Sequence, residues 1–373
     1  MDTIFIIVCI LIMWPMLFSV PVLYGSSSKK EKTSDTLIMT SIGLFVAFLA
    51  WVSFGYFLVF NLSSSLFEGF FSYVMALQRG DNELILEVVL QGCFFLYAAG
   101  MFIGTLIHKV EWKFFALFIP IWLLVVYVPS AFLLWNEQGF LNQIGALDFS
   151  GGLVVHLTAG TTSLILSRTF KEGVLEVPDR HSNMIINYIA TTLICFGWFG
   201  FNLGPLGSAS TFSGLIILNT ILAISGGILG YLIIQKSSLT SEDVLTGMIV
   251  GLVTSTALVG YASPIMLFIV PLISGVVTCH LRKLTYFNDP VDSFVLNGIG
   301  GIIGTLGLIL FANPLFTPAG QTGLLLGGHF TFALSQVFAL LIIFALATIG
   351  AQISVTLTNL IYSRKKVVIY ENQ

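Results

Sequence analysis

Charged side chains are scarce in this sequence. Only 9% of its 373 residues are Asp, Glu, Lys or Arg, whereas 56% are hydrophobic. A soluble domain of this length would carry about a quarter charged residues. The composition therefore argues against a soluble domain, and the lack of a basic surface argues against nucleic-acid binding.

Cysteines are few, and their spacing shows no pattern. Cys9, Cys93, Cys195 and Cys279 all fall in apolar segments. This arrangement fits neither a disulfide framework nor a metal cluster, so we expect four small buried side chains. The sequence also lacks a nucleophile–base pair, a metal-ligand spacing and a nucleotide-binding loop, so we predict no enzymatic activity and no cofactor.

Long hydrophobic runs are abundant, and the mean hydropathy is +0.98. Apolar segments occur at roughly 4–24, 37–60, 84–107, 114–134, 151–166, 185–203, 215–234, 244–260, 265–281, 294–311 and 330–361. Each is about 16 to 32 residues long, enough for a spanning helix, with the shorter ones needing polar neighbours or a thinner bilayer. We therefore predict an all-α, polytopic membrane protein of eleven transmembrane helices that forms a single membrane domain, 1–373. The last helix would be about 48 Å long, so we expect it to tilt strongly or to extend beyond the bilayer.

The basic residues predict the orientation of these helices. Of the 15 Lys and Arg residues, only Arg79 falls in an even-numbered connection. The others are Lys29, Lys30, Lys32, Lys109, Lys113, Arg168, Lys171, Arg180, Lys236, Arg282, Lys283, Arg364, Lys365 and Lys366. Because basic residues favour the cytoplasmic side, we predict an external N-terminus and a cytoplasmic C-terminus. The short connections favour a bacterial plasma membrane.

Two of the apolar segments share a pattern. His156 in VVHLTAG and Asn297 in VLNGIGG are each followed by glycine four residues later. Each segment is also preceded by an aspartate, Asp148 or Asp292. When two consecutive units each contain an odd number of spanning helices, the second unit crosses the bilayer in the opposite direction to the first. The pattern thus predicts two five-helix inverted repeats, about 1–168 and 184–312, followed by a long tilted C-terminal helix at 330–362.

A titratable side chain inside an apolar segment is costly and marks a functional site, which singles out His156. The alternative is a buried histidine with its hydrogen bonds satisfied by neighbours. Phe94 in VLQGCFF, and the aromatic rings of the FGWFGFN stretch at 196–202, are candidates to line a lumen. Trp135, at the end of its segment, is either a membrane anchor or a cation–π site worth about 0.5–2 kcal/mol to a small cation.

Several of these stretches resemble the ammonium transporter (Amt/Mep/Rh) family. GALDFSGGLVVH is similar to its fifth-helix motif, FGWFGFNLG to its sixth and NDPVDSFVLNGIGGIIGT to its tenth, while GMIVGLVTSTALVGYASP is a looser version of the eighth. The resemblance covers nearly the whole chain. It implies a homotrimer in the lipid bilayer, with a narrow ammonium/ammonia pore between the halves of each subunit.

The resemblance also implies roles for individual side chains. Trp135 matches the tryptophan of the external site that recruits the cation, and Asp148 matches the aspartate that supports this site without touching the ion. Phe94 and Phe201 match the stacked gate below the site. Trp198 matches a tryptophan that lines the lumen.

Two positions depart from the family pattern. His156 matches the first of two pore histidines, but the second position is Asn297. The serine of the recruitment site is replaced by Pro205, which has no hydroxyl; Ser208 and Ser210 lie nearby. We expect such a pore to conduct an ammonia-like substrate with weakened proton transfer, because an amide does not readily accept and release a proton.

Two alternatives remain open at this point. One is a non-transporting ammonium sensor or binding protein on the same scaffold, and the other is a channel with relaxed selectivity, for example towards potassium. Members of the family are often plugged by a PII-type signalling protein. Only eleven residues follow Tyr362, which lacks much of the usual regulatory segment, so PII contact is a weaker expectation.

Overall fold

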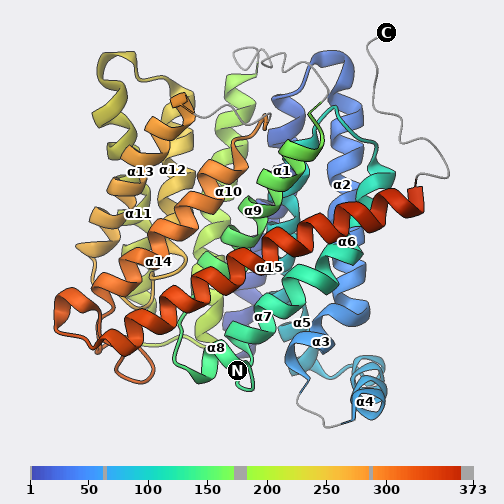
Figure 1. Ribbon diagram of the computed structural model, residues 1–373, viewed down its shortest axis with the longest axis horizontal. Helices are drawn as coiled ribbons and strands as arrows, with labels where there is room; N and C mark the ends of the chain where they lie inside the picture. The colour runs from blue at the N-terminus through green and yellow to red at the C-terminus, as the bar shows by residue number, and fades with distance from the viewer. Residues whose placement is uncertain (1, 62–64, 172–182, 285–288, 363–373) are drawn as a thin grey trace.

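The computed structural model describes residues 2–61, 65–171, 183–284 and 289–362, and within these ranges its regular structure is entirely helical (Figure 1). The α-helices are α1 (Thr3–Ser26), α2 (Thr33–Ala50), α3 (Tyr56–Phe60), α4 (Leu66–Arg79), α5 (Asn82–Ile103), α6 (Trp112–Trp122), α7 (Val128–Trp135), α8 (Phe140–Gln143), α9 (Thr158–Thr169), α10 (Met184–Leu203), α11 (Ser213–Gln235), α12 (Ser241–Ser255), α13 (Met266–Leu284), α14 (Gly300–Phe311) and α15 (Phe330–Tyr362). His181, Arg180, Arg364, Lys365 and Lys366 lie outside the described residues.

Nine helical stretches in the described ranges are long and apolar enough to cross a membrane, which supports a multi-pass membrane protein. Segments 151–166 and 244–260 are shorter or more polar. The first consists of a π-helical turn, Gly152–Leu157, that continues into α9, and the second is helical only as far as the end of α12 at Ser255. Another π-helical turn, Phe294–Ile299, continues into α14.

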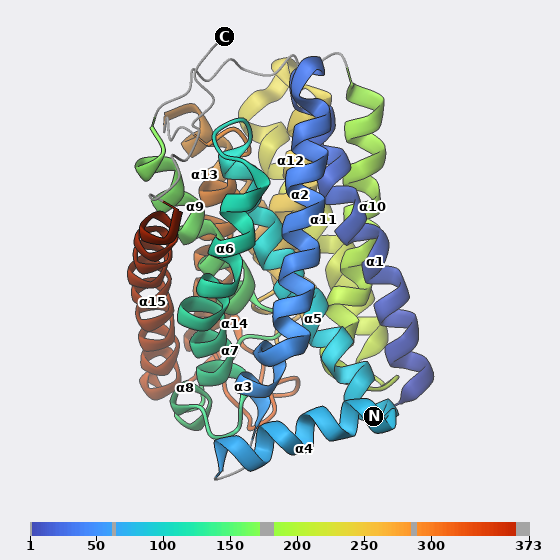
Figure 2. The same cartoon turned by 90° about the vertical axis from the view of Figure 1, so that its right-hand side faces the viewer.

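The long helices run side by side between two ends of the molecule (Figure 2). The α1–α2, α5–α6 and α11–α12 connections lie at one end, together with the C-terminal ends of α9 and α13. We call this the basic end, because it carries Lys29, Lys30, Lys32, Lys109, Lys113, Arg168, Lys171, Lys236, Arg282 and Lys283. Helix α4, which ends at Arg79, lies across the opposite end.

Helix α15 crosses the molecule obliquely and packs against α9, α6 and α14 (Figure 1). Its 33 residues give a length of about 50 Å at 1.5 Å per residue. The helix is long and is inclined to the other long helices, so the expectation of a long, tilted C-terminal helix is confirmed.

Stacked aromatic rings form the core beside α9. Phe95 lies between Trp51 and Trp122, with ring centroids 5.7 and 6.1 Å away. The Trp122 indole nitrogen donates a hydrogen bond of 2.8 Å to the Thr162 hydroxyl on α9. Since the three rings are almost fully buried, this core holds α9 in place. The four cysteines are also buried, as expected.

Glycines allow the helices that carry His156 and Asn297 to cross backbone to backbone. A Cβ atom at Gly160 would lie 2.2 Å from the backbone nitrogen of Gly298, and one at Gly301 would lie 2.4 Å from the carbonyl oxygen of Gly152. Only glycine permits such an approach. α9 runs towards the basic end and α14 runs away from it, so the two helices have opposite directions (Figure 1).

Candidate functional site

Asp148 begins the helical stretch that carries His156. Its Oδ2 accepts hydrogen bonds from the backbone N–H groups of Leu153 (3.0 Å) and Val154 (2.9 Å), which would otherwise lack partners at the start of the helix. Gly151 makes the sharp entry possible with φ +104°, a conformation that strains other residues. Asp148 is 95% buried and therefore orients backbone rather than facing solvent.

Trp135 is joined to the same loop. It is the last residue of α7, and its indole N–H donates to the carbonyl oxygen of Asp148 at 3.0 Å. Its ring meets the Phe94 ring edge-on, with centroids 5.8 Å apart. The backbone at Asp148 thus fixes the indole at the end of the molecule opposite the basic end.

Phe94 on α5 and Phe201 on α10 form the next layer. Their ring centroids are only 4.4 Å apart, and both side chains are buried. Trp198 lies three residues before Phe201 on α10 and is also buried, whereas Phe196 is 53% exposed. The expectation that the aromatic rings of this stretch all face the lumen is therefore wrong for Phe196, because it lies on the other face of the helix.

His156 lies on the side of this layer that faces the basic end, and its ring stacks on Trp198. The two ring planes are nearly parallel, at 4°, with centroids 5.5 Å apart. The Phe201 ring lies 6.2 Å from the imidazole. His156 is fully buried, yet its Nε2 and the Trp198 Nε1 both lack a hydrogen-bond partner. Buried polar atoms rarely lack partners, so a small polar ligand that reached these two atoms could satisfy them.

The other imidazole nitrogen is occupied. Nδ1 of His156 lies 3.1 Å from Oδ1 of Asn297, and Nδ2 of Asn297 donates to the Ser293 hydroxyl at 3.2 Å. That hydroxyl also accepts a hydrogen bond from Ser163 at 2.9 Å. In this arrangement an amide oxygen can only accept, so Nδ1 carries the proton and Nε2 is left as an acceptor.

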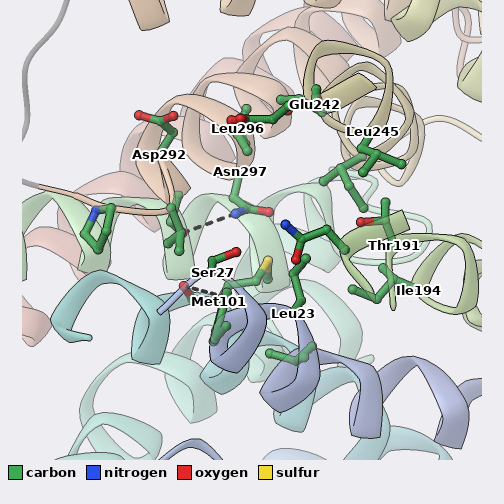
Figure 3. Close-up of a pocket in the computed structure, with 18 of the residues that line it drawn as sticks. Leu23, Ser27, Met101, Thr191, Ile194, Glu242, Leu245, Asp292, Leu296 and Asn297 are labelled. Atoms are coloured by element: carbon green, nitrogen blue, oxygen red, sulfur yellow. Dashed lines mark hydrogen bonds between the residues drawn. The ribbon is translucent and has the colours of Figure 1, made fainter. Parts of the chain in front are cut away.

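A cavity of about 360 Å³ opens on the far side of Asn297, towards the basic end. Asn297 projects into it opposite Met101 (Figure 3), and the partly exposed Asp292 and Glu242 also line it. Arg282 bridges the two carboxylates, at 2.7 Å from Asp292 and 3.3 Å from Glu242. The cavity on the basic-end side of His156 therefore carries charged side chains, whereas the layers on the opposite side of His156 are aromatic.

The structure adds Tyr97, which the sequence analysis missed. Its ring centroid is 6.0 Å from that of His156, 5.1 Å from Trp198 and 5.7 Å from Phe201. It lies one helical turn after Phe94, and this spacing was a usable signal because residues three apart share a helix face.

Pro205 and the serines near it lie at the surface: Pro205 and Ser210 are exposed and Ser208 is partly exposed. Pro205 is exposed in a short turn, and the Ser210 hydroxyl accepts a hydrogen bond from the backbone of Phe212. Ser208 lines a shallow surface hollow that contains several carboxylates, namely Asp2, Asp81, Glu83 and Glu87.

His280 and His329 are exposed near helix ends, and His108 lies in a turn at the basic end. Within the described ranges, no group of three or more His, Cys, Asp or Glu residues could hold a metal ion.

Comparison with known proteins agrees with this geometry. The model of the Ammonium Transporter Family matches residues 4–369. An ammonium transporter of Bacillus subtilis is 31% identical over 346 residues, which covers 87% of this chain and 84% of that protein. In fold, the chain is similar to Saccharomyces cerevisiae Mep2, with 24% identity and a TM-score of 0.82 over 100% of this chain and 91% of that one. It is also similar to a structure described as a sensor Amt protein, with 21% identity and a TM-score of 0.84 over 98% of this chain and 94% of that one. The chain belongs to the ammonium transporter family.

Proposed function

We propose that this protein transports ammonium or ammonia across the plasma membrane through a pore within each chain. The observation that carries the proposal is the His156 imidazole, which is sealed among aromatic rings with Nδ1 held by Asn297 and Nε2 left without a partner. This acceptor and the Trp198 N–H provide the two hydrogen-bonding roles that ammonia itself can complement.

Trp135 and Phe94 form the external end of the proposed path. An ammonium ion gains cation–π attraction there, but entering the aromatic layers would cost several kcal/mol or more in lost hydration. The ion is therefore bound at the Trp135 face, with Asp148 positioning the indole through its backbone. It gives its proton to external water before neutral ammonia passes between Phe94 and Phe201.

Asn297 determines the tautomer of His156 and the capacity for proton transfer at the centre of the proposed pore. It holds His156 in one tautomer, so Nε2 can accept an N–H from ammonia while Trp198 donates to the ammonia lone pair. Because an asparagine does not readily take up or release a proton, the pair relays protons less well than two imidazoles would. We propose conduction of ammonia with weakened proton transfer.

Uptake of isotope-labelled ammonium into cells that lack other ammonium transporters tests this function. Cells with the native protein should accumulate label, and His156→Leu should lower uptake by roughly tenfold or more, since the unpaired acceptor Nε2 is removed. His280→Ala, at an exposed position, is the matched control and should behave as the native protein does. Equal uptake with and without the native protein would contradict transport.

A second candidate is a non-transporting ammonium sensor. The replacements Asn297 and Pro205 favour it, because both remove groups that the family resemblance assigns to cation handling. Ammonium that raises the melting temperature of the purified protein, without any uptake in the cell assay, would favour the sensor. A sensor is expected to signal through a partner, and a PII-type protein is the proposed candidate.

We further propose eleven membrane spans, with the Gly152–Thr169 stretch and α12 as the two beyond the nine long apolar helices. The opposite directions of α9 and α14, each preceded by a π-helical turn that carries the polar residue, support inverted repeats at about 1–168 and 184–312. The basic end is proposed to face the cytoplasm and the N-terminus the outside. Cysteines placed at Arg79 and Lys236 should react with an impermeant reagent from outside and inside, respectively.

The assembly is proposed to be a homotrimer in the bilayer, with one pore in each subunit. Native mass spectrometry of the detergent-solubilised protein tests this directly. A mass of three chains is expected, and a monomer that still supports uptake after reconstitution would contradict the trimer.

A further inference from the structure

Tyr97 occupies the boundary between the lumen and the cavity at the basic end. On one side its ring meets those of His156, Trp198 and Phe201, with centroids 5.1 to 6.0 Å away. On the other side it lines the 360 Å³ cavity together with Asn297. It is only 4% exposed, so neighbouring side chains surround the ring on most sides.

The lumen is consequently closed twice by aromatic rings. Phe94 and Phe201 meet at 4.4 Å above His156, and Tyr97 lies against the same Phe201 on the side of the cavity. Tyr97 and Asn297 both line the cavity and both lie against His156, so a molecule that moves from the free Nε2 of His156 to the cavity passes beside the Tyr97 ring.

Tyr97 also has space into which it can move. Met101 follows it by one turn on α5 and lines the same cavity (Figure 3). Methionine is unbranched and adapts to a neighbour's shape. A rotation of the Tyr97 side chain into the cavity would open the path without moving any helix backbone.

We propose that Tyr97 is an inner gate that discriminates ammonia from its methylated form. The proposal rests on transport through this pore. Ammonia is small enough to pass a modest rotation of the ring, whereas a methyl group requires a larger one. An extra methyl group changes selection in an apolar site by about 10- to 200-fold, which sets the size of effect that a gate of this kind can produce.

The test compares ammonium and methylammonium uptake by the full protein in liposomes. Tyr97→Ile removes the ring and should raise the ratio of methylammonium to ammonium uptake by roughly tenfold. Tyr97→Phe keeps the ring and should retain the native ratio, while Tyr97→Trp should lower the uptake of both. Tyr188→Ile changes an exposed tyrosine of α10 and is the matched control.

Each result has a defined meaning. If the native protein moves neither solute, the proposed function fails and the gate fails with it. If it moves ammonium but the ratio is unchanged in Tyr97→Ile, the gate alone is overturned. Should Tyr97→Ile not fold, as judged by its melting profile, Tyr97→Met decides instead: the ratio should rise as expected for Tyr97→Ile, because the flexible side chain lacks the ring.

Discussion

At the scale of single residues, the site depends on how the His156 imidazole is held. Asn297 accepts from Nδ1, and its own amide N–H is fixed by Ser293, which in turn contacts Ser163. This chain of hydrogen bonds determines which imidazole nitrogen faces the lumen. Ser293 is therefore a positioning residue for the site, although it does not touch His156.

Replacing Ser293 tests this chain. Ser293→Ala leaves the Asn297 amide donor buried without its partner, which costs about 1–3 kcal/mol and lets the amide turn over. We expect ammonium uptake to fall severalfold and to be restored in Ser293→Thr, which keeps the hydroxyl. Uptake is measured in liposomes, with the exposed Ser237→Ala as control. Native uptake by Ser293→Ala would show that the amide orientation does not matter.

At the scale of helices, the site depends on a close crossing and on a cap. Gly160 and Gly301 bring the two polar helices together, and Asp148 caps the beginning of one of them. Both features act on stability and on the pore at once. Matched variants can separate the two effects.

Gly160→Ala should destabilise the protein. The new Cβ atom would lie 2.2 Å from the Gly298 nitrogen, so one helix backbone must shift, and overpacking of this kind costs about 1–3 kcal/mol or more. Gly214→Ala, in α11 with open space around it, should instead be neutral or slightly stabilising. Thermal unfolding in detergent measures both, and equal melting temperatures would contradict the crossing.

Asp148→Ala should lower both stability and transport. Two buried backbone N–H groups lose their acceptor, at about 1–3 kcal/mol each, and the loop that holds Trp135 loosens. The comparison is Asp81→Ala, which removes a similar cap from α5 at an exposed position and should cost only about 0.5–2 kcal/mol. If the two variants had the same uptake per folded protein, Asp148 would have no part in the pore.

At the scale of the whole molecule, the composition and charge pattern predicted the membrane-spanning helices and the grouping of basic connections at one end. The sequence pattern that His156 and Asn297 share predicted that they form a pair, and the structure joins them by a hydrogen bond. Tyr97 and the outward-facing Phe196 were missed, since the rotation of α5 and α10 is set by neighbouring helices. Helix α4 was missed because its amphipathic sequence is too short and polar to read as a span.

The pH dependence of stability offers a further test at this scale. His108, in a turn at the basic end, has its pKa lowered from 6.5 to about 4 by burial and then by Lys32 and Lys29. Below pH 6.5 the unfolded chain takes up a proton that the folded chain does not, so this residue lowers stability progressively as the pH falls towards about 4.

His108→Asn removes this titration and keeps a residue that tolerates the observed φ of +64°. We expect the melting temperature of the variant to fall less than that of the native protein between pH 6.5 and 4. His329→Asn, at an exposed position, serves as control. Identical pH profiles for native protein and His108→Asn would show that His108 is readily protonated in the fold.

The central claim is that a pore with one histidine and one asparagine conducts ammonia with weakened proton transfer. Charge movement after an ammonium pulse on reconstituted proteoliposomes tests it most directly, with uptake recorded in parallel. We predict clear uptake with a small current in the native protein, and a larger current in Asn297→His. A native current as large as that of a two-histidine homologue, unchanged in Asn297→His, would contradict the account.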